Sequence, residues 1–179
     1  MTEIRTVQNA ERLFLDALRW LGASYGQHTF YVERDIVYEV QRRLNDLAEA
    51  EDGTWKVYND YPILPGTRRS LSADLALLGP SNEVVLAAEF KYEPCHARHD
   101  VLKNKLPVTV WKDIVKDTER VRQFVDQGRA QVAYAVVIDE GGDYLARRDL
   151  GVYADRQSWS GTPRHRHTIE ALIFRYPQR

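Results

Sequence analysis

Hydrophobic residues recur every three or four positions in three segments of the chain, which is the spacing of one face of a helix. The first segment predicts a helix over residues 6–22 that ends at Gly22, and the second predicts one over about residues 32–48. The third begins at Trp111 and stops at Gly128. The three apolar stripes consist of Val7, Ala10, Leu13, Phe14, Ala17, Leu18 and Leu21; of Ile36, Val37, Val40, Leu44 and Leu47; and of Trp111, Ile114, Val115, Thr118, Val121 and Val125.

Shorter runs of β-branched, aromatic and aliphatic residues predict strands at 55–61, 72–78, 84–92, 132–138 and 168–176. After the first run, Pro62, Pro65 and Gly66 predict a turn. Residues 79–82, between the second and third runs, have the composition of a hairpin loop, so these two strands are expected to be antiparallel. The stretch from Gly141 to Gly161 gives no clear pattern.

The predicted order is helix, helix, three strands, helix, strand, irregular segment, strand. This order favours an α/β fold with a mixed central β-sheet flanked by helices. A length of 179 residues suits one domain with one sizeable core, so residues 1–179 are expected to form a single domain. Such a fold hosts many functions, and the function must be sought in particular residues.

The composition describes a globular protein, since 44% of the residues are hydrophobic and 28% are charged. The net charge of −1 lacks the basic excess of a typical nucleic-acid binder, so any such contact would use local patches. Candidates are Arg42 with Arg43, Arg68 with Arg69, Arg147 with Arg148, and residues 164–167. The single cysteine and the lack of a signal-like or membrane-spanning apolar segment indicate a cytoplasmic protein that does not enter a membrane.

Two acids and a lysine gather on one face of the predicted hairpin. Because side chains alternate along a strand, Glu89 and Lys91 share one face and Phe90 takes the other. A symmetrical hairpin loop would put Asp74 opposite Ala87, diagonal to Glu89 and on its face. Two carboxylates so placed repel each other unless a cation compensates them. The pattern therefore predicts a Mg²⁺ site, which Mn²⁺ could also fill.

A magnesium ion in this position would lower the pKa of a bound water and neutralise charge on a cleaving phosphodiester. Lys91 would orient or help to deprotonate that water, or offset phosphate charge. The alternative is a surface ion pair between Glu89 and Lys91. Asp74 favours the functional interpretation, because a carboxylate inside an otherwise apolar strand costs stability unless it has a partner.

With Asp74, fourteen intervening residues and then Glu89, Phe90 and Lys91, the chain resembles the PD-(D/E)xK nuclease superfamily, the fold of many restriction and repair endonucleases. The resemblance covers about residues 32–138 and implies a restriction endonuclease-like core of order α-β-β-β-α-β, with the N-terminal helix and the C-terminal strand as additions. It implies a metal-dependent nuclease that hydrolyses nucleic-acid phosphodiester bonds, with DNA as the expected substrate. Asp74 and Glu89 would bind the metal, the Phe90 carbonyl would complete the site, and Lys91 would serve the attacking water. Ala73 stands where the superfamily's name-giving proline would be.

The resemblance also implies a further metal ligand, a glutamate early in the preceding helix. At about 100° per residue, Glu33 falls in line with Val37, Val40 and Leu44, the stripe expected to face the sheet, whereas Glu39 points about 120° away. We therefore expect Glu33 to reach the site. The alternative is that a first-turn glutamate only complements the helix dipole.

Other interpretations remain open. The chain could be a non-cleaving nucleic-acid-binding or accessory protein that retains the nuclease fold, or an enzyme acting on another phosphate ester. A homodimer is one way in which both strands of a duplex would be cut. Cys95, His96 and His99 suggest zinc, but a structural zinc site wants four ligands and there is no second cysteine. Phosphate contact or simple solvation is expected for the nearby Arg98, Lys103 and Lys105, and solvation for Asp60.

Overall fold

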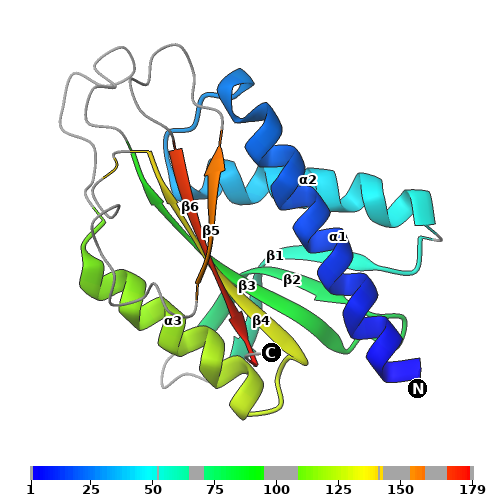
Figure 1. Ribbon diagram of the computed structural model, residues 1–179. Helices are drawn as coiled ribbons and strands as arrows, with labels where there is room; N and C mark the ends of the chain where they lie inside the picture. The colour runs from blue at the N-terminus through cyan, green and yellow to red at the C-terminus, as the bar shows by residue number, and fades with distance from the viewer. Residues whose placement is uncertain are drawn as a thin grey trace.

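The computed structural model describes residues 2–51, 53–64, 71–94, 109–140, 142, 154–159 and 169–177. The chain begins with helix α1 (Thr2–Ser24), a short 3₁₀ helix η1 (Tyr25–Gln27) and helix α2 (Glu33–Glu51). Strands β1 (Lys56–Leu64), β2 (Leu71–Leu78) and β3 (Val84–Glu93) follow, then helix α3 (Trp111–Asp126) and strands β4 (Val132–Asp139), β5 (Ala154–Trp159) and β6 (Ile169–Tyr176). The predicted α/β class and the predicted order of the first seven helices and strands are confirmed (Figure 1).

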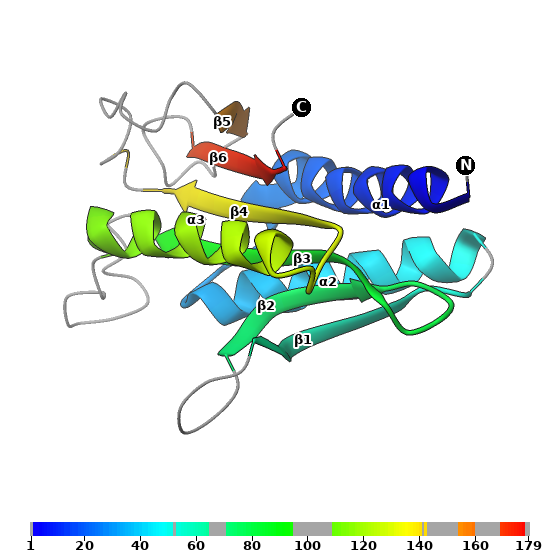
Figure 2. The ribbon, with the colours of Figure 1, turned by 90° about the horizontal axis from the view of Figure 1, so that it is seen from below.

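The strands form one six-stranded sheet in the order β1-β2-β3-β4-β6-β5. Strands β3 and β4 are parallel, with α3 as the connection between them, and every other neighbouring pair is antiparallel. The sheet is therefore mixed, as the sequence predicted. Figure 2 shows this order along the sheet, from β1 at the bottom to β5 at the top.

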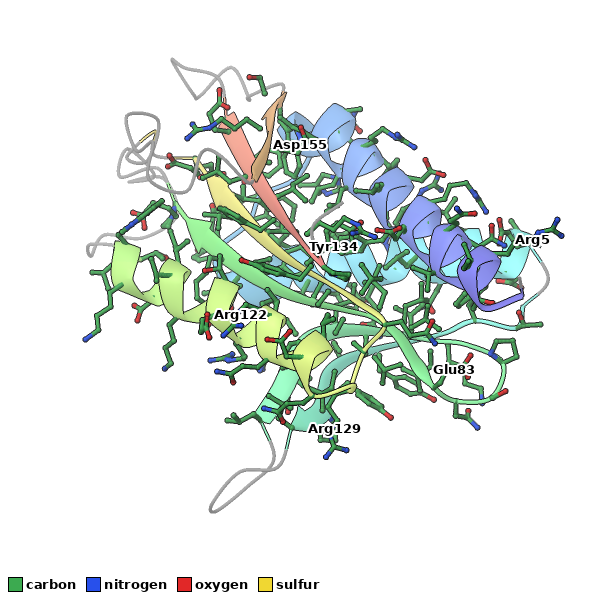
Figure 3. All side chains as sticks on the ribbon, turned by 60° about the horizontal axis from the view of Figure 1, so that its bottom comes forward. Arg5, Glu83, Arg122, Arg129, Tyr134 and Asp155 are labelled. Atoms are coloured by element: carbon green, nitrogen blue, oxygen red, sulfur yellow. The ribbon has the colours of Figure 1, made fainter. Side chains whose placement is uncertain are left out.

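Helices α1 and α2 cover one face of the sheet and α3 covers the other (Figures 1 and 2). The first face buries Phe14 of α1 and Leu44 of α2 against Phe90 of β3. The second buries Phe124 of α3 against Ala135 of β4. Burial of each helix stripe on a flat apolar face supplies the main stabilisation of such layers. Figure 3 shows Tyr134 of β4 among the interior side chains, where its hydroxyl donates a hydrogen bond of 2.5 Å to Glu11.

Strand β1 continues through Pro62 to Leu64, so the prediction that the turn begins at Pro62 was wrong, while Pro65 and Gly66 lie outside the described residues. Proline removes a backbone donor and is tolerated in a sheet chiefly on an edge strand. β1 is an edge strand and pairs with β2 alone, which explains why the proline does not end it.

The predicted end of the first helix at Gly22 was also wrong, because α1 runs on to Ser24. A Cβ atom at position 22 would lie 2.7 Å from the indole ring of Trp159. Glycine is therefore needed for close packing against β5 rather than for a helix end. Strand β5 itself lies in the stretch that gave no clear pattern in the sequence.

The β2–β3 hairpin is antiparallel as predicted, but its register differs from the predicted one. Leu75 pairs with Ala88, and continuing this register by one residue sets Asp74 directly opposite Glu89, not diagonal to it. The loop spans residues 79–83, one residue more than predicted, and the Gly79 amide donates to the Glu83 carbonyl across it. The register also shifts at a bulge between Leu77 and Leu78. The change amounts to two residues, so Asp74 stays on the face expected for it.

None of the helices in the described ranges is long and apolar enough to cross a membrane.

Candidate active site

Asp74 and Glu89 face each other from neighbouring strands at the centre of the candidate site. The Phe90 amide donates a hydrogen bond of 2.7 Å to Asp74 Oδ2, which fixes that carboxylate against β3. The Glu89 side chain is only 2% exposed. Glu89 and Lys91 lie on the face covered by α3, while Phe90 packs on the opposite face, as the alternation along β3 predicted.

Lys91 connects the two helix layers of the molecule. Its Nζ lies 3.0 Å from Glu33 Oε2 at the start of α2 and 3.0 Å from Asp117 Oδ2 on α3. It also donates to the Phe90 carbonyl at 3.3 Å. The contact with Asp117 is an ion pair rather than a well-aligned hydrogen bond. The lysine is thus held between carboxylates that come from opposite sides of the sheet.

Arg120 of α3 supplies a second cation. Its Nη1 donates to Glu89 Oε2 at 2.9 Å, and its Nη2 lies 3.3 Å from Asp117 Oδ1. The described part of the site therefore holds four carboxylates and two cations, from β2, β3, α2 and α3: Glu33, Asp74, Glu89 and Asp117, with Lys91 and Arg120.

Sequence reasoning missed Asp117 and Arg120. The buried stripe of α3 is Ile114, Asp117, Thr118, Val121 and Phe124, whereas the predicted stripe had Val115, which is exposed. Asp117 lies three residues after Ile114 and four before Val121, so its spacing places it on the buried face. A carboxylate at an inward-facing position of a helix was the signal that could have revealed it.

Burial and mutual repulsion dominate the electrostatics of the two acids on the hairpin. Burial, with repulsion from Asp74, raises the pKa of Glu89 to about 9, although Arg120 opposes the shift. Burial also raises the pKa of Asp74, against the effect of the Phe90 amide. At neutral pH the pair therefore keeps a proton, which Glu89 holds.

The pKa of Lys91 is shifted upward, whereas the pKa of a buried lysine without partners is shifted downward. Burial alone would lower its pKa, but Glu33 and Asp117 outweigh burial and hold the pKa above the ordinary lysine value. Burial in turn raises the pKa of Glu33, with Lys91 opposing. Lys91 is thus an ammonium at every physiological pH.

The oxygen atoms of Asp74, Glu89 and Phe90 are of the kind that bind a magnesium ion. Glu89 Oε1 is buried and has no hydrogen-bond partner among the described residues. Asp74 lies opposite Glu89 on β2, and its Oδ2 accepts from the amide of Phe90, whose carbonyl belongs to the next residue of β3 after Glu89. These are hard oxygen donors, and Mg²⁺ often uses only one or two carboxylates and keeps several waters. No group of three or more Asp, Glu, His or Cys side chains in the described ranges lies close enough to share one ion. These residues fit an ion held by two carboxylates and water, not a site with three or more such side chains.

Glu33 lies at the site, on the face of α2 expected for it, but its contact is with Lys91. The competing candidate Glu39 instead accepts hydrogen bonds from Arg42 at 2.8 and 3.2 Å on the helix surface. Of the two glutamates, Glu33 is therefore the one that the structure brings to the site.

A small pocket, about 340 Å³ with its open mouth included, reaches Glu33 and Asp74. Glu33, Val37 and Asp74 line its inner part, and Arg34, Asn59 and Asp60 line its rim. Asp60 is exposed, as expected, yet it lies at the mouth of this pocket rather than apart from the site.

Several sequence candidates are not part of this site. Cys95, His96 and His99, with Arg98, Lys103 and Lys105, lie outside the described residues, as do residues 68–69, 147–148 and 164–167. Arg42 and Arg43 lie over the ring of Trp20, at 5.6 and 5.7 Å from its centre. This pair therefore packs on α1.

Comparisons of the chain with models of protein families, with curated proteins and with solved structures give no match.

Proposed function

We propose that the chain is a Mg²⁺-dependent nuclease that acts in the cytoplasm and hydrolyses phosphodiester bonds of nucleic acid, with DNA as the substrate. The observation that carries this proposal is the opposed pair Asp74 and Glu89, with the buried Glu89 Oε1 lacking a hydrogen-bond partner among the described residues. The resemblance of Asp74, Glu89 and Lys91 to the PD-(D/E)xK motif, within helices and strands of the order α2-β1-β2-β3-α3-β4, supports the same activity.

Asp74, Glu89 and the Phe90 carbonyl would hold the metal ion. When bound, Mg²⁺ would neutralise charge on the phosphodiester and acidify an attacking water. The residues of the chain position the reactants around it. Asp74 is fixed by the Phe90 amide and Glu89 by Arg120, so both side chains are held in place, and Glu89 has only to lose its proton to become a ligand.

Lys91 acts through its charge. Because Glu33 and Asp117 hold its pKa above the ordinary value, it stays protonated and does not serve as a general base. An ammonium with two carboxylate partners can orient a water or offset charge on a phosphate oxygen. Of the roles expected from sequence, the environment of Lys91 supports these two.

The experiment that tests the proposal incubates supercoiled, linear and single-stranded DNA with the protein and Mg²⁺ or Mn²⁺. We expect the wild type to cut at least one substrate, and Lys91→Ala, Glu89→Gln and Asp74→Asn each to lose the activity while keeping the fold. Cleavage that survives unchanged in all three variants would point to a contaminating nuclease. Linear products from supercoiled DNA would indicate that both strands are cut, as by a homodimer.

Calorimetric titration with Mn²⁺ tests the metal ligands directly. Glu89→Gln and Asp74→Asn each remove a negative oxygen donor, so we expect the affinity to fall at least tenfold in each variant. Unchanged affinity in both variants would contradict the assignment.

A second candidate is a nucleic-acid-binding protein that retains the nuclease fold and does not cleave. It is favoured by the fact that Lys91 and Arg120 already contact Glu33, Glu89 and Asp117, so the chain itself neutralises part of the acidic charge. DNA binding without cleavage in either metal, together with no Mn²⁺ binding, would select this candidate.

A further inference from the structure

A groove lies beside the candidate site, between the start of α2 and the segment before it. Its walls are residues 27–30, the first two turns of α2 and Asn59 of β1, and its volume is about 1000 Å³ with the open mouth included. Arg34 and Asn59 line both this groove and the smaller pocket that holds Glu33 and Asp74. The groove therefore adjoins the candidate active site.

The groove presents an aromatic ring to solvent. Tyr38 is 58% exposed and lines its wall. Tyr31 and Val32, just before α2, are also exposed large hydrophobic residues, but they are not among the residues that line the groove. Tyr38 is therefore the exposed hydrophobic ring that the groove wall itself offers to a ligand.

Arg34 is the cation among the residues that line the groove. Asp35 and Glu39 line it too, but their contacts are with other groups: Asp35 Oδ2 accepts from the amides of Tyr31 and Val32, and Glu39 accepts from Arg42. The Arg34 side chain is 79% exposed, and its guanidinium has a long contact of 3.4 Å with Asp60. It can therefore turn to a phosphate at the junction of the two pockets.

We propose that this groove binds an unpaired nucleotide of the substrate strand, with its base stacked on Tyr38 and its phosphate on Arg34. The proposal rests on the nuclease function. Along α2, the five-residue separation between Glu33 and Tyr38 corresponds to about 7.5 Å, the length of about two stacked nucleotides. The base would thus lie one or two positions from the phosphate that is cut.

The chemistry selects an unpaired strand over a duplex. In a double helix the faces of the bases are covered by their neighbours, whereas a single strand can lay a base on an exposed ring. Amide and imidazole groups of Asn59, Gln27 and His28 also line the groove and can contact the edge of such a base. The substrate of this nuclease is therefore single-stranded, or a duplex with an unpaired end or flap.

The test measures binding of a fluorescent dT₁₂ oligonucleotide and of a matched blunt hairpin by anisotropy in EDTA, where no cleavage occurs. Stacking on one aromatic side chain is worth about 1–3 kcal/mol. We therefore expect Tyr38→Ala to weaken dT₁₂ binding at least fivefold and Tyr38→Phe to retain it, because stacking needs the ring and not the hydroxyl. Tyr58 of β1 is also exposed and does not line the groove, so Tyr58→Ala serves as the matched control and should bind as the wild type does.

The outcomes separate this proposal from the nuclease function. Wild-type affinity in Tyr38→Ala, an equal loss in Tyr58→Ala, or tighter binding of the blunt hairpin than of dT₁₂ overturns the groove proposal, even if the wild type cuts DNA. A Tyr38-dependent affinity for dT₁₂ in a protein that cuts nothing supports the groove and rejects the nuclease. Glu89→Gln should bind dT₁₂ as the wild type does and fail to cut it.

Discussion

Arg120 Nη1 donates a hydrogen bond of 2.9 Å to Glu89 Oε2, so helix α3 supplies a cation to the acid that the sequence motif places on β3. The same guanidinium reaches Asp117, and Asp117 reaches Lys91. The α3 layer therefore does more than cover the sheet. It sets the charge balance around the two carboxylates of the hairpin.

Replacement of Arg120 by alanine should lower the free energy of unfolding by about 2 kcal/mol. Removing one partner of a fully buried pair costs about 3–5 kcal/mol, and we expect less here because Arg120 is partly exposed and Glu89 can keep a proton. Arg122→Ala, on the outer side of the same helix, breaks only surface pairs with Glu119 and Asp126 and should cost under about 1 kcal/mol. Urea unfolding of both variants measures the difference. Equal losses of unfolding free energy in the two variants would show that the Arg120 contacts stabilise the fold no more than surface ion pairs do.

The hairpin and its acidic face could be predicted from sequence, because the period of two along a strand fixes which side chains share a face. Glu89, Lys91 and Asp74 lie together for that reason. Their register could not be predicted, because it depends on the length of the loop and on the bulge between Leu77 and Leu78. The error was two residues and left the face unchanged.

Asp117 shows what the pattern of hydrophobic residues alone misses. The predicted stripe of α3 includes Val115 and omits Asp117, because a carboxylate is not counted among apolar positions. Only the packing of α3 on the sheet shows that Asp117 lies beside Lys91. The roles of Gly22 and Pro62 also depend on tertiary packing. Gly22 makes room for the ring of Trp159, and Pro62 is tolerated in β1 because β1 is an edge strand.

The stability of the metal-free protein should fall as the pH rises from about 5 to 9. The pKa of Glu89 is raised from 4.5 to about 9 by burial and Asp74, so between these values the folded state holds a proton that the unfolded state has released. Stability from this proton is fully present below the unfolded pKa and is lost as the pH passes the folded one, with a slope of up to about 1.4 kcal/mol per pH unit. Urea unfolding at several pH values measures it. Glu89→Gln should lack this slope and should be more stable than the wild type at pH 9; parallel curves would contradict the assignment.

Asp117→Asn should lower the cleavage rate at saturating substrate about tenfold with little change in KM. The asparagine removes one of the two carboxylates that hold Lys91, so the ammonium is less well placed while the groove is intact. Asp113→Asn, in the exposed first turn of the same helix, is the matched control and should cleave at the wild-type rate. An equal effect of both substitutions would show that Asp117 does not act through Lys91.

Glu33→Gln should reduce cleavage strongly, because it removes the other carboxylate partner of Lys91 and an acid from the wall of the pocket. Glu49→Gln, an exposed glutamate in the last turns of α2, should leave cleavage unchanged. Initial rates with Mg²⁺ and with Mn²⁺ measure the effect. A Glu33→Gln variant that cuts at the wild-type rate would show that Glu33 only complements the dipole of α2 and takes no part in cleavage.

Binding of a divalent ion should release about one proton at pH 7. Glu89 holds that proton in the metal-free protein because its pKa is about 9, whereas a carboxylate must be ionised to bind a metal. The ion must therefore displace the proton, and its apparent affinity should rise about tenfold per pH unit from pH 6 to 8 and level off above about pH 9. Calorimetric titration with Mn²⁺ in two buffers of different ionisation enthalpy counts the protons directly. The same titration at pH 9.5 is the internal control and should release less than half a proton, because Glu89 is then already mostly ionised. Tight binding at pH 7 with no proton released would mean that the ion does not use Glu89, and the metal site would have to be sought elsewhere.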